Sequence, residues 1–301
     1  MSSISLSNMF ISNGLIKKNR NSCYLVAVIF LASLWGTASA EVVSKKMPNG
    51  LTATADYYQG QADEPVVLVL HGFMQTREFP TVARLANSLK DEGYTVLVPT
   101  LTLNIDKRNK SLACEAIHTH TMEEDVAEIA EWVNWLYDRQ NKLITLIAHS
   151  AGSLTLLALM ESRPDQRIDK LILVSLLPFN DDPLSESSNL KAYEQAQEDV
   201  KQGRQGLGDY SLAFCDKYPS EPEAFLSYRQ WAQGRTINAL NDLKVPAYVI
   251  IGGSDKRMHP GWRELLKQTN AQVITVEHAG HFFDTQYEFD LLDHVIEITE
   301  H

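Results

Sequence analysis

Residues 143–160 read LITLIAHSAGSLTLLALM, an apolar strand pattern followed from Leu154 by a mostly apolar helix pattern. Ser150 lies at the turn between the two patterns, with the small residues Ala148 and Gly152 on either side. A serine on a sharp strand-to-helix turn needs small neighbours, because the backbone bends tightly and packs closely there. The segment follows the pattern G-x-S-x-G except that alanine replaces the first glycine. It predicts a nucleophilic serine, and a serine that only caps the helix is the alternative.

Strand patterns alternate with helix patterns on both sides of this segment. Pro48-Asn49-Gly50 joins the first two strands in a predicted hairpin, because Asn-Gly favours tight hairpin turns. The expected strands cover residues 42–47, 51–58, 66–70, 95–99, 143–148, 170–175, 247–251 and 272–276. The expected helices cover residues 82–89, 121–136, 154–160, 260–268 and 283–298. Such alternation indicates βαβ units, and so an α/β fold with a mostly parallel sheet.

Residues 176–243 interrupt the alternation. This block is rich in proline, glycine and acidic residues, and it holds helix candidates around 190–202 and 221–233. We interpret it as an insertion over the carboxyl ends of the strands, where open α/β sheets bind ligands. Most of its aromatic residues are expected to pack the insertion onto the sheet rather than to line a pocket.

A serine hydroxyl is a poor nucleophile unless a neighbouring base removes its proton. His281 is the best candidate, because its loop follows the last predicted strand and so points toward the same sheet edge as Ser150. His278 is the alternative, although it lies nearer the strand end.

The imidazole needs a carboxylate that fixes its tautomer and stabilises its cationic form. Asp255 follows the strand at 247–251 and is the predicted acid. Asp181 and Asp182 follow an earlier strand and are the alternatives.

A tetrahedral intermediate needs hydrogen-bond donors for its oxyanion. The predicted donors are the backbone N–H groups of Phe73, directly after the strand at 66–70, and of Ala151, directly after the serine. We interpret His71 as a structural residue of this loop rather than as a second base.

These motifs together resemble the α/β-hydrolase superfamily. The resemblance rests on His71-Gly72-Phe73, the elbow around Ser150, Gly253-Ser254-Asp255 and Gly280-His281-Phe282, in the family's chain order of serine, acid and histidine. It covers roughly residues 45–300. The resemblance implies an eight-stranded, mostly parallel sheet flanked by helices, with a helical cap inserted after the sixth strand. It also implies esterase, lipase, thioesterase or peptidase chemistry. Serine argues against the dehalogenases and epoxide hydrolases of this fold, which use aspartate.

The N-terminus has the features of a secretory signal peptide. Lys17, Lys18 and Arg20 precede a short apolar run at 24–35, and Ala38-Ser39-Ala40 resembles a cleavage site. We expect cleavage after Ala40, a mature domain at 41–301, and a secreted or periplasmic location. An uncleaved anchor is the alternative, and either Met1 or Met9 could start the chain.

The charge balance bears on possible partners. The 301 residues carry 27 basic and 38 acidic side chains, a net charge of −11. Without the three basic residues of 1–40 the balance is 24 − 38 = −14. An acidic protein is repelled by nucleic acid phosphates, so no nucleic-acid partner is expected. After signal cleavage no stable membrane span is expected either.

The sequence offers one weak candidate for a metal site. Cys114, His118 and His120 lie close in sequence, but two histidines at i,i+2 without a clear third ligand make a poor metal site. We read these histidines as part of a polar loop near a pocket mouth. No metal or cofactor is expected. Cys114 and Cys215 remain after signal cleavage, and they either form a disulfide or stay as partly buried thiols.

The resulting prediction is a serine hydrolase that acts through an acyl-enzyme, with a small-molecule carboxylic ester as its substrate. Thioesterase or aminopeptidase-like activity on the same fold, and a non-catalytic binding protein, are the alternatives. An aminopeptidase needs carboxylates that bind the substrate's ammonium group. The candidates in the insertion are Glu186, Glu194, Glu198, Glu221 and Glu223.

Overall fold

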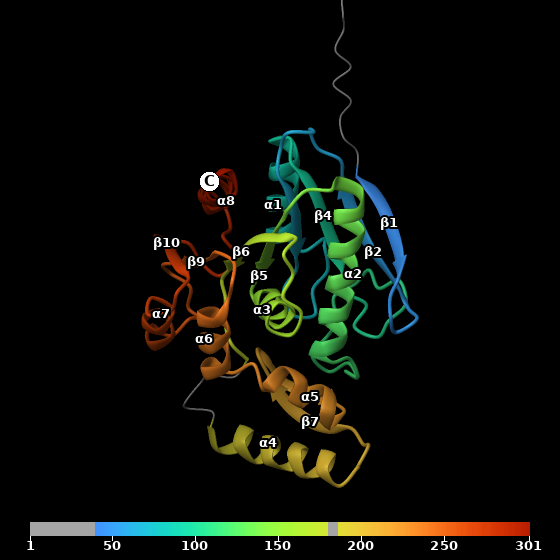
Figure 1. Ribbon diagram of the computed structural model, residues 1–301. Coiled ribbons are helices and arrows are strands. Elements are labelled where there is room, and N and C mark those ends of the chain that lie inside the picture. The colour runs from blue at the N-terminus through green and yellow to red at the C-terminus, as the bar shows by residue number, and fades with distance from the viewer. Residues whose placement is uncertain (1–39, 180–185) are drawn as a thin grey trace, which may run out of the picture. The chain divides into compact units, whose positions relative to one another are not determined.

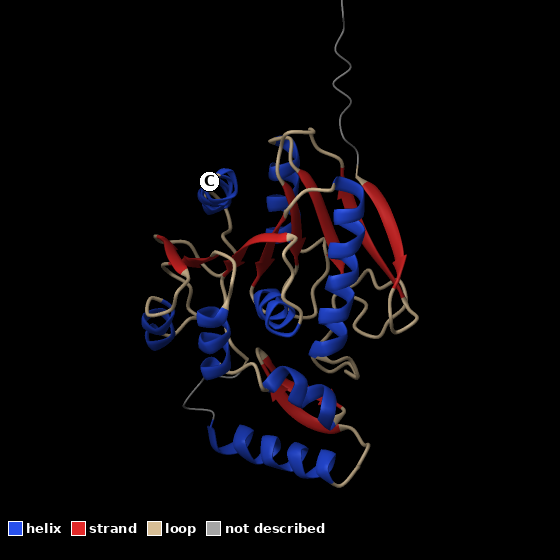
Figure 2. Ribbon diagram, viewed as in Figure 1, coloured by secondary structure: helices blue, strands red, loops and turns tan. Residues whose placement is uncertain are grey.

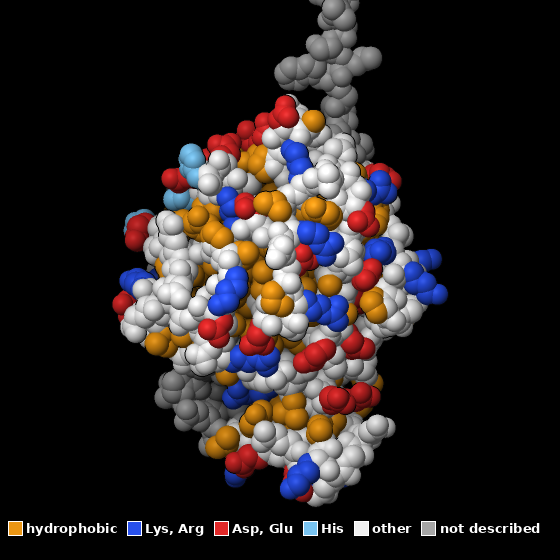
Figure 3. All heavy atoms as spheres, viewed as in Figure 1, with side chains coloured by type: hydrophobic (Ala, Val, Ile, Leu, Met, Phe, Trp, Pro, Cys, Tyr) orange, Lys and Arg blue, Asp and Glu red, His pale blue; other side chains and the backbone are white. Residues whose placement is uncertain are grey.

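The computed structural model describes residues 40–179 and 186–301 (Figure 1). The predicted signal segment before Ala40, including both possible start positions, lies outside the described residues, as do Asp181 and Asp182. Residues from Ala38 onward form one compact unit. Acidic and basic side chains are interspersed over the face shown in Figure 3.

An eight-stranded sheet forms the centre of this unit (Figure 2). Across the sheet, the strands are β1 (Glu41–Lys46), β2 (Thr52–Tyr58), β4 (Thr95–Thr100), β3 (Val66–Leu70), β5 (Ile144–His149), β6 (Ile168–Val174), β9 (Ala247–Gly252) and β10 (Gln272–Val276). The β1–β2 and β2–β4 pairs are antiparallel, and the other five pairs are parallel. The predicted mostly parallel sheet is therefore confirmed.

The central strands are apolar because helices cover both of their faces. Every residue of β3 and β5 is buried. One hydrophobic cluster joins one face of the sheet to α2 (Met122–Gln140) and α3 (Gly152–Ser162). A second cluster joins the other face to α1 (Pro80–Asp91) and α8 (Tyr287–Glu300). This two-sided cover holds the strand ends rigidly at the edge where the loops emerge.

Two helix starts show how local sequence sets the element bounds. Helix α2 begins after Thr121, whose hydroxyl accepts a hydrogen bond from the Glu124 N–H while the Glu124 carboxylate accepts one from the Thr121 N–H. This is the predicted capping box. Helix α8 begins at Tyr287, later than the expected residue 283, because Phe283 and Thr285 have positive φ angles that a helix excludes.

The insertion between β6 and β9 is a mixture of helices and strands. It contains α4 (Glu186–Lys201), β7 (Gly208–Leu212), β8 (Cys215–Ser220), α5 (Pro222–Arg229) and α6 (Gln233–Asp242). The expected helices are present after the sixth strand, and β7 and β8 add an antiparallel hairpin that the sequence analysis did not predict. One side of the hairpin is buried, and the ring of Tyr210 stacks on Phe225 of α5 with centroids 4.0 Å apart. The helix candidates around 190–202 and 221–233 correspond to α4 and α5, and α6 begins at the end of the second stretch.

A disulfide ties this insertion to the long loop between β4 and α2. Cys114 of the loop bonds to Cys215 of β8, with Cα atoms 5.3 Å apart. Next to it, the His118 N–H donates to the Pro219 carbonyl at 2.9 Å. The remaining helix, α7 (Pro260–Leu266), follows β9. Within residues 40–179 and 186–301, no helix combines the length and apolarity that a membrane crossing needs.

Candidate active site

Ser150 occupies the turn between β5 and α3 in a conformation that few non-glycine residues adopt. Its φ is 55°, and its N–H donates to the Val174 carbonyl at 2.7 Å. A Cβ at Gly152 would lie 2.3 Å from the His71 carbonyl oxygen, so only glycine fits there. Backbone strain of this kind persists where the surroundings enforce it, and it clusters at functional sites. The close packing holds the serine hydroxyl out at the carboxyl edge of the sheet.

The side chains of Ser150, His281 and Asp255 form a continuous hydrogen-bonded chain. His281 Nε2 lies 3.0 Å from Ser150 Oγ, and His281 Nδ1 lies 2.8 Å from Asp255 Oδ2. A carboxylate can only accept, so Nδ1 carries the proton and the Nε2 lone pair faces the serine hydroxyl. The structure thus brings together three residues from the loops after β5, β9 and β10.

Asp255 is itself held by its own loop. Its Oδ1 accepts a hydrogen bond from the Arg257 N–H at 2.9 Å, and the Arg263 guanidinium donates to the backbone carbonyls of Gly253 and Asp255. Burial acts to raise the pKa of this carboxyl. The hydrogen bond and the charge of His281 nevertheless hold the pKa below its usual value. Asp255 is therefore ionised at neutral pH and can stabilise an imidazolium.

The alternative base, His278, has no contact with the serine in the structure. His278 is exposed on the loop before His281. Asp181 and Asp182 belong to the segment that the structure leaves undescribed. His71 has the structural role expected of it: its Nδ1 donates to the Gly72 carbonyl at 2.8 Å, and its Nε2 accepts the Leu101 N–H at 3.2 Å.

The backbone around Phe73 lies against the serine turn. A Cβ at Gly72 would be 3.4 Å from Ser150 Cβ, so the loop passes directly over the nucleophile. Among the described residues, the N–H groups of Phe73 and Ala151 have no hydrogen-bond acceptor. Both residues line the same cavity. Two unpaired amides beside a serine hydroxyl are suited to binding an oxyanion.

The cavity beside these amides is partly open to solvent, and the empty space in it and at its mouth amounts to about 290 Å³. Most of its wall is apolar. Its lining residues are His71, Gly72, Phe73, Met74, Leu101, Leu103, His120, Asp125, Ala151, Gly152, Thr155, Phe179 and Tyr228. The insertion contributes Phe179 and Tyr228 to this wall. Of its other aromatic residues, Tyr210 and Phe225 stack on each other within the insertion, and Phe214 is exposed.

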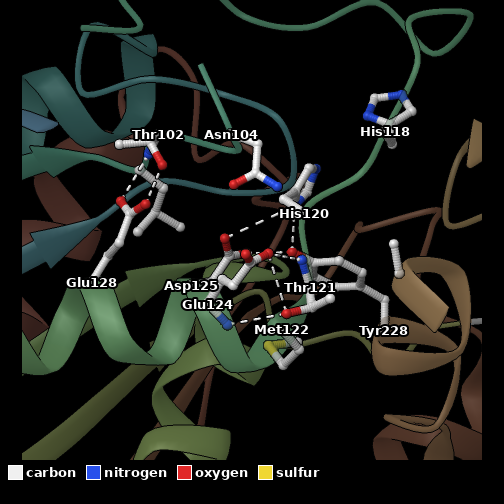
Figure 4. A network of polar contacts seen from close by, with 12 residues as sticks. Thr102, Asn104, His118, His120, Thr121, Met122, Glu124, Asp125, Glu128 and Tyr228 are labelled. Atoms are coloured by element: carbon white, nitrogen blue, oxygen red, sulfur yellow. Dashed lines mark hydrogen bonds and ion pairs between the residues drawn. The ribbon is translucent and has the colours of Figure 1, made fainter. Parts of the chain in front are cut away.

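A polar cluster forms one part of the wall, and the sequence analysis did not identify it (Figure 4). The Tyr228 hydroxyl donates to Asp125 Oδ2 at 2.5 Å, and His120 Nδ1 lies 2.6 Å from the same hydroxyl. Burial raises the pKa of Asp125 well above its ordinary value and lowers that of His120 to about 3. Both histidines lie in the predicted loop and His120 lines the cavity, but their rings are buried. Among the described residues, no group of three or more His, Cys, Asp or Glu side chains is arranged to hold a metal ion.

His149 and Ser175 are two further residues that the sequence analysis assigned no role. His149 Nε2 and Ser175 Oγ both donate to the backbone carbonyl of His281, at 2.9 and 2.8 Å. They fix the loop that carries the imidazole.

Comparison with solved structures shows the same fold. The thioesterase domain from the curacin biosynthetic pathway matches with a TM-score of 0.57 at 18% identity, over 86% of this chain and 99% of that one. An esterase from Pyrococcus furiosus matches with a TM-score of 0.58 at 17% identity, over 88% and 91%. A thermophilic esterase from Thermogutta terrifontis matches with a TM-score of 0.58 at 18% identity, over 86% and 98%. At these identities the likeness concerns the fold alone.

Sequence comparison assigns the family. No curated protein has significant sequence similarity to the chain. The family model described as the alpha/beta hydrolase family matches residues 66–289, which include all three residues of the hydrogen-bonded chain. With this match, the sheet order and the serine turn between β5 and α3, the chain belongs to the alpha/beta hydrolase family.

Proposed function

We propose that the protein is a serine hydrolase that cleaves carboxylic esters through an acyl-enzyme. The observation that carries this proposal is the unbroken chain of contacts from Ser150 Oγ through His281 to Asp255. Each contact lies within hydrogen-bond distance and needs no rearrangement before proton transfer.

The geometry supports a two-step reaction. Ser150 Oγ bonds to the substrate's carbonyl carbon while its proton moves to His281 Nε2. The carbonyl π electrons move onto oxygen, where the N–H groups of Phe73 and Ala151 bind the negative charge. When the tetrahedral intermediate collapses, the bond to the leaving group breaks and His281 gives that group its proton. A water molecule then repeats the sequence on the acyl-enzyme, which releases the acid and restores the serine.

Ionised Asp255 keeps the imidazole in the productive tautomer during both steps. It stabilises the imidazolium without taking its proton. These steps use side chains and backbone amides only, so the proposed reaction requires neither metal nor cofactor.

Esters are the preferred substrate class within this chemistry. An aminopeptidase needs carboxylates placed to bind an ammonium group. Glu194, Glu198, Glu221 and Glu223 are absent from the cavity lining, and the carboxyl that does line it, Asp125, is already paired with the Tyr228 hydroxyl. Thioester cleavage uses the same steps and remains the second candidate.

We also propose that the protein works in a secreted or periplasmic setting. The signal-like segment before Glu41 and the disulfide between Cys114 and Cys215 support an oxidising compartment. Sequencing the N-terminus of the protein recovered from its native host tests this, and a mature chain that retains residues 1–40 would contradict it.

The decisive experiment measures p-nitrophenyl ester hydrolysis by the wild-type protein and by Ser150→Ala. We expect turnover with the wild type and loss of turnover with the variant, while its melting temperature is retained. A fluorophosphonate should label the wild type and leave Ser150→Ala unlabelled. Equal ester hydrolysis by both proteins would refute the assignment of the nucleophile. A wild type that neither turns over esters nor reacts with the fluorophosphonate would favour a binding protein.

A further inference from the structure

Three polar side chains lie on the wall of the cavity that Phe73 and Ala151 also line. His120, Asp125 and Tyr228 have exposed fractions of 1%, 4% and 2%, so their polar groups are shielded from solvent. They come from three places: the loop before α2, the first turn of α2, and helix α5 of the insertion. Figure 4 shows the three groups converging.

The hydrogen bonds in this cluster leave one polar atom, His120 Nε2, without a partner among the described residues. Tyr228 has a single hydroxyl proton, which it donates to Asp125 Oδ2. His120 Nδ1 must then donate to the hydroxyl oxygen, so His120 Nε2 is an unprotonated acceptor. If Asp125 carries the proton instead, it donates to Tyr228, Tyr228 donates to His120 Nδ1, and Nε2 becomes an N–H donor. In both arrangements Nε2 is buried and has no partner among the described residues.

Neither His118 nor Arg108, the two nearby side chains with ring or guanidinium nitrogens, pairs with this atom. The ring of His118 packs edge-on to His120 with centroids 5.8 Å apart. Arg108 donates to the backbone carbonyls of Leu101, Met74, Lys110 and Gln75, and it approaches His71 rather than His120. Buried polar atoms are nearly always paired, so the unpaired nitrogen of a residue that lines the cavity calls for a partner, and a ligand's polar group at this wall would supply one.

We propose that the cavity binds a short acyl group that carries a hydroxyl, and that this hydroxyl pairs with His120 Nε2. A hydroxyl fits both arrangements of the cluster, because it can donate to a bare nitrogen and can accept from an N–H. A methyl group at the same place leaves the nitrogen unpaired. An ammonium group suits only the arrangement in which Nε2 is an acceptor.

This inference rests on the proposed ester hydrolysis, which decides the part of the substrate that enters the cavity. His281 protonates the leaving group, so that group lies beside the imidazole. Neither Ser150 nor His281 is among the lining residues, whereas both oxyanion donors are, so the cavity lies on the side of the oxyanion donors and away from the imidazole. The cavity therefore receives the acyl side. Its interior has room for little more than a water-sized group unless the walls move, which favours a short chain.

The test compares p-nitrophenyl butyrate with the p-nitrophenyl esters of 2-hydroxybutyric, 3-hydroxybutyric and 3-aminobutyric acid. For the wild type we expect kcat/KM for at least one hydroxy ester to exceed that for butyrate by about 10-fold, the effect of one well-placed hydrogen bond. His120→Leu removes the nitrogen and should bring this ratio close to one. Tyr228→Phe breaks the cluster and should lower the ratio as well.

His118→Leu is the matched control. His118 is a buried histidine of the same loop that stacks on Tyr218 and does not line the cavity, so this variant should keep the wild-type ratio. The wild-type ratio is informative even if a variant fails to fold.

The outcomes separate this inference from the proposed function. Hydrolysis of butyrate with no preference for a hydroxyl would overturn the inference and leave the esterase assignment standing. A preference for the amino ester over both hydroxy esters would also overturn it. Absence of all ester hydrolysis, with no labelling by a fluorophosphonate, would refute the proposed function itself.

Discussion

The side chain of His149 supports the backbone of His281 across the sheet edge. His149 Nε2 donates to the His281 carbonyl at 2.9 Å. A carbonyl can only accept, so His149 holds its proton on Nε2, and burial lowers its pKa to about 3. The residue before the nucleophile therefore fixes the loop that carries the base. Because Ser175 donates to the same carbonyl, two neighbouring strands hold one loop.

We predict that His149→Leu lowers kcat more than it raises KM. Loss of the donor lets the His281 loop shift, and a displacement of about 1 Å at a catalytic group can cost about 100-fold in rate. The measurement is steady-state hydrolysis of a short activated ester. His149→Gln retains an N–H donor and should recover part of kcat. A His149→Leu enzyme with wild-type kcat would show that the contact has no positioning role.

Replacement of His281 should abolish most of the activity, whereas replacement of its neighbour His278 should leave the activity almost unchanged. His281→Ala removes the group that contacts Ser150, so kcat/KM should fall by about 10⁴-fold or more. His278→Ala changes an exposed residue three positions earlier and should stay within about 2-fold of the wild type. Parallel ester assays on the two variants check this. A larger loss of kcat/KM in His278→Ala than in His281→Ala would show that His281 is not the base.

The sequence predicts the parts of the site that directly follow strands. Ser150, Asp255 and His281 each lie after an apolar run, and parallel strands bring such positions to one edge. The hairpin formed by β7 and β8 could not be predicted in this way. It is held by contacts distant in sequence, which are the disulfide to Cys114 and the packing of Tyr210 on Phe225.

The polar cluster in the cavity left one signal in the sequence. Asp125 follows Met122 by three residues and precedes Ile129 by four, so it falls on the apolar face of its helix. A carboxylate there indicates a buried polar partner. The identity of that partner could not be inferred, because Tyr228 lies 103 residues further along the chain.

Acid should destabilise the protein partly through His71. Burial and the charge of Arg108 lower the pKa of His71 to about 3, below its unfolded value of about 6.5. Between these values the unfolded chain binds a proton that the folded protein does not. The contribution of His71 to stability is therefore complete above about pH 6.5 and is lost as the pH falls toward 3, by roughly 1 kcal/mol per pH unit.

The comparison of His71→Gln with the wild type isolates this effect. Denaturant unfolding from pH 7 to pH 4 should show a shallower loss of stability in the variant. The difference between the two proteins cancels the opposite contribution of Asp125 and Glu128, whose pKa values burial raises. His301→Gln changes an exposed residue and should follow the wild-type curve. Identical pH dependence in His71→Gln and the wild type would contradict a neutral His71.

Removal of the disulfide should affect stability more than catalysis. The bond closes a loop with a sequence separation of 101 residues. Restriction of the unfolded chain then stabilises the fold by about 4.7 kcal/mol in the chain-entropy model, and about 2–5 kcal/mol is typical. We expect Cys114→Ala/Cys215→Ala to lower the free energy of unfolding by that amount in denaturant titrations without reductant. The loop remains bound to β8 through the His118 N–H and the Pro219 carbonyl, so kcat for a short ester should change little.

Added dithiothreitol should destabilise the wild type to the level of the double variant and leave the variant unchanged. Equal stability of the oxidised and reduced wild type would show that the bond does not restrain the unfolded chain.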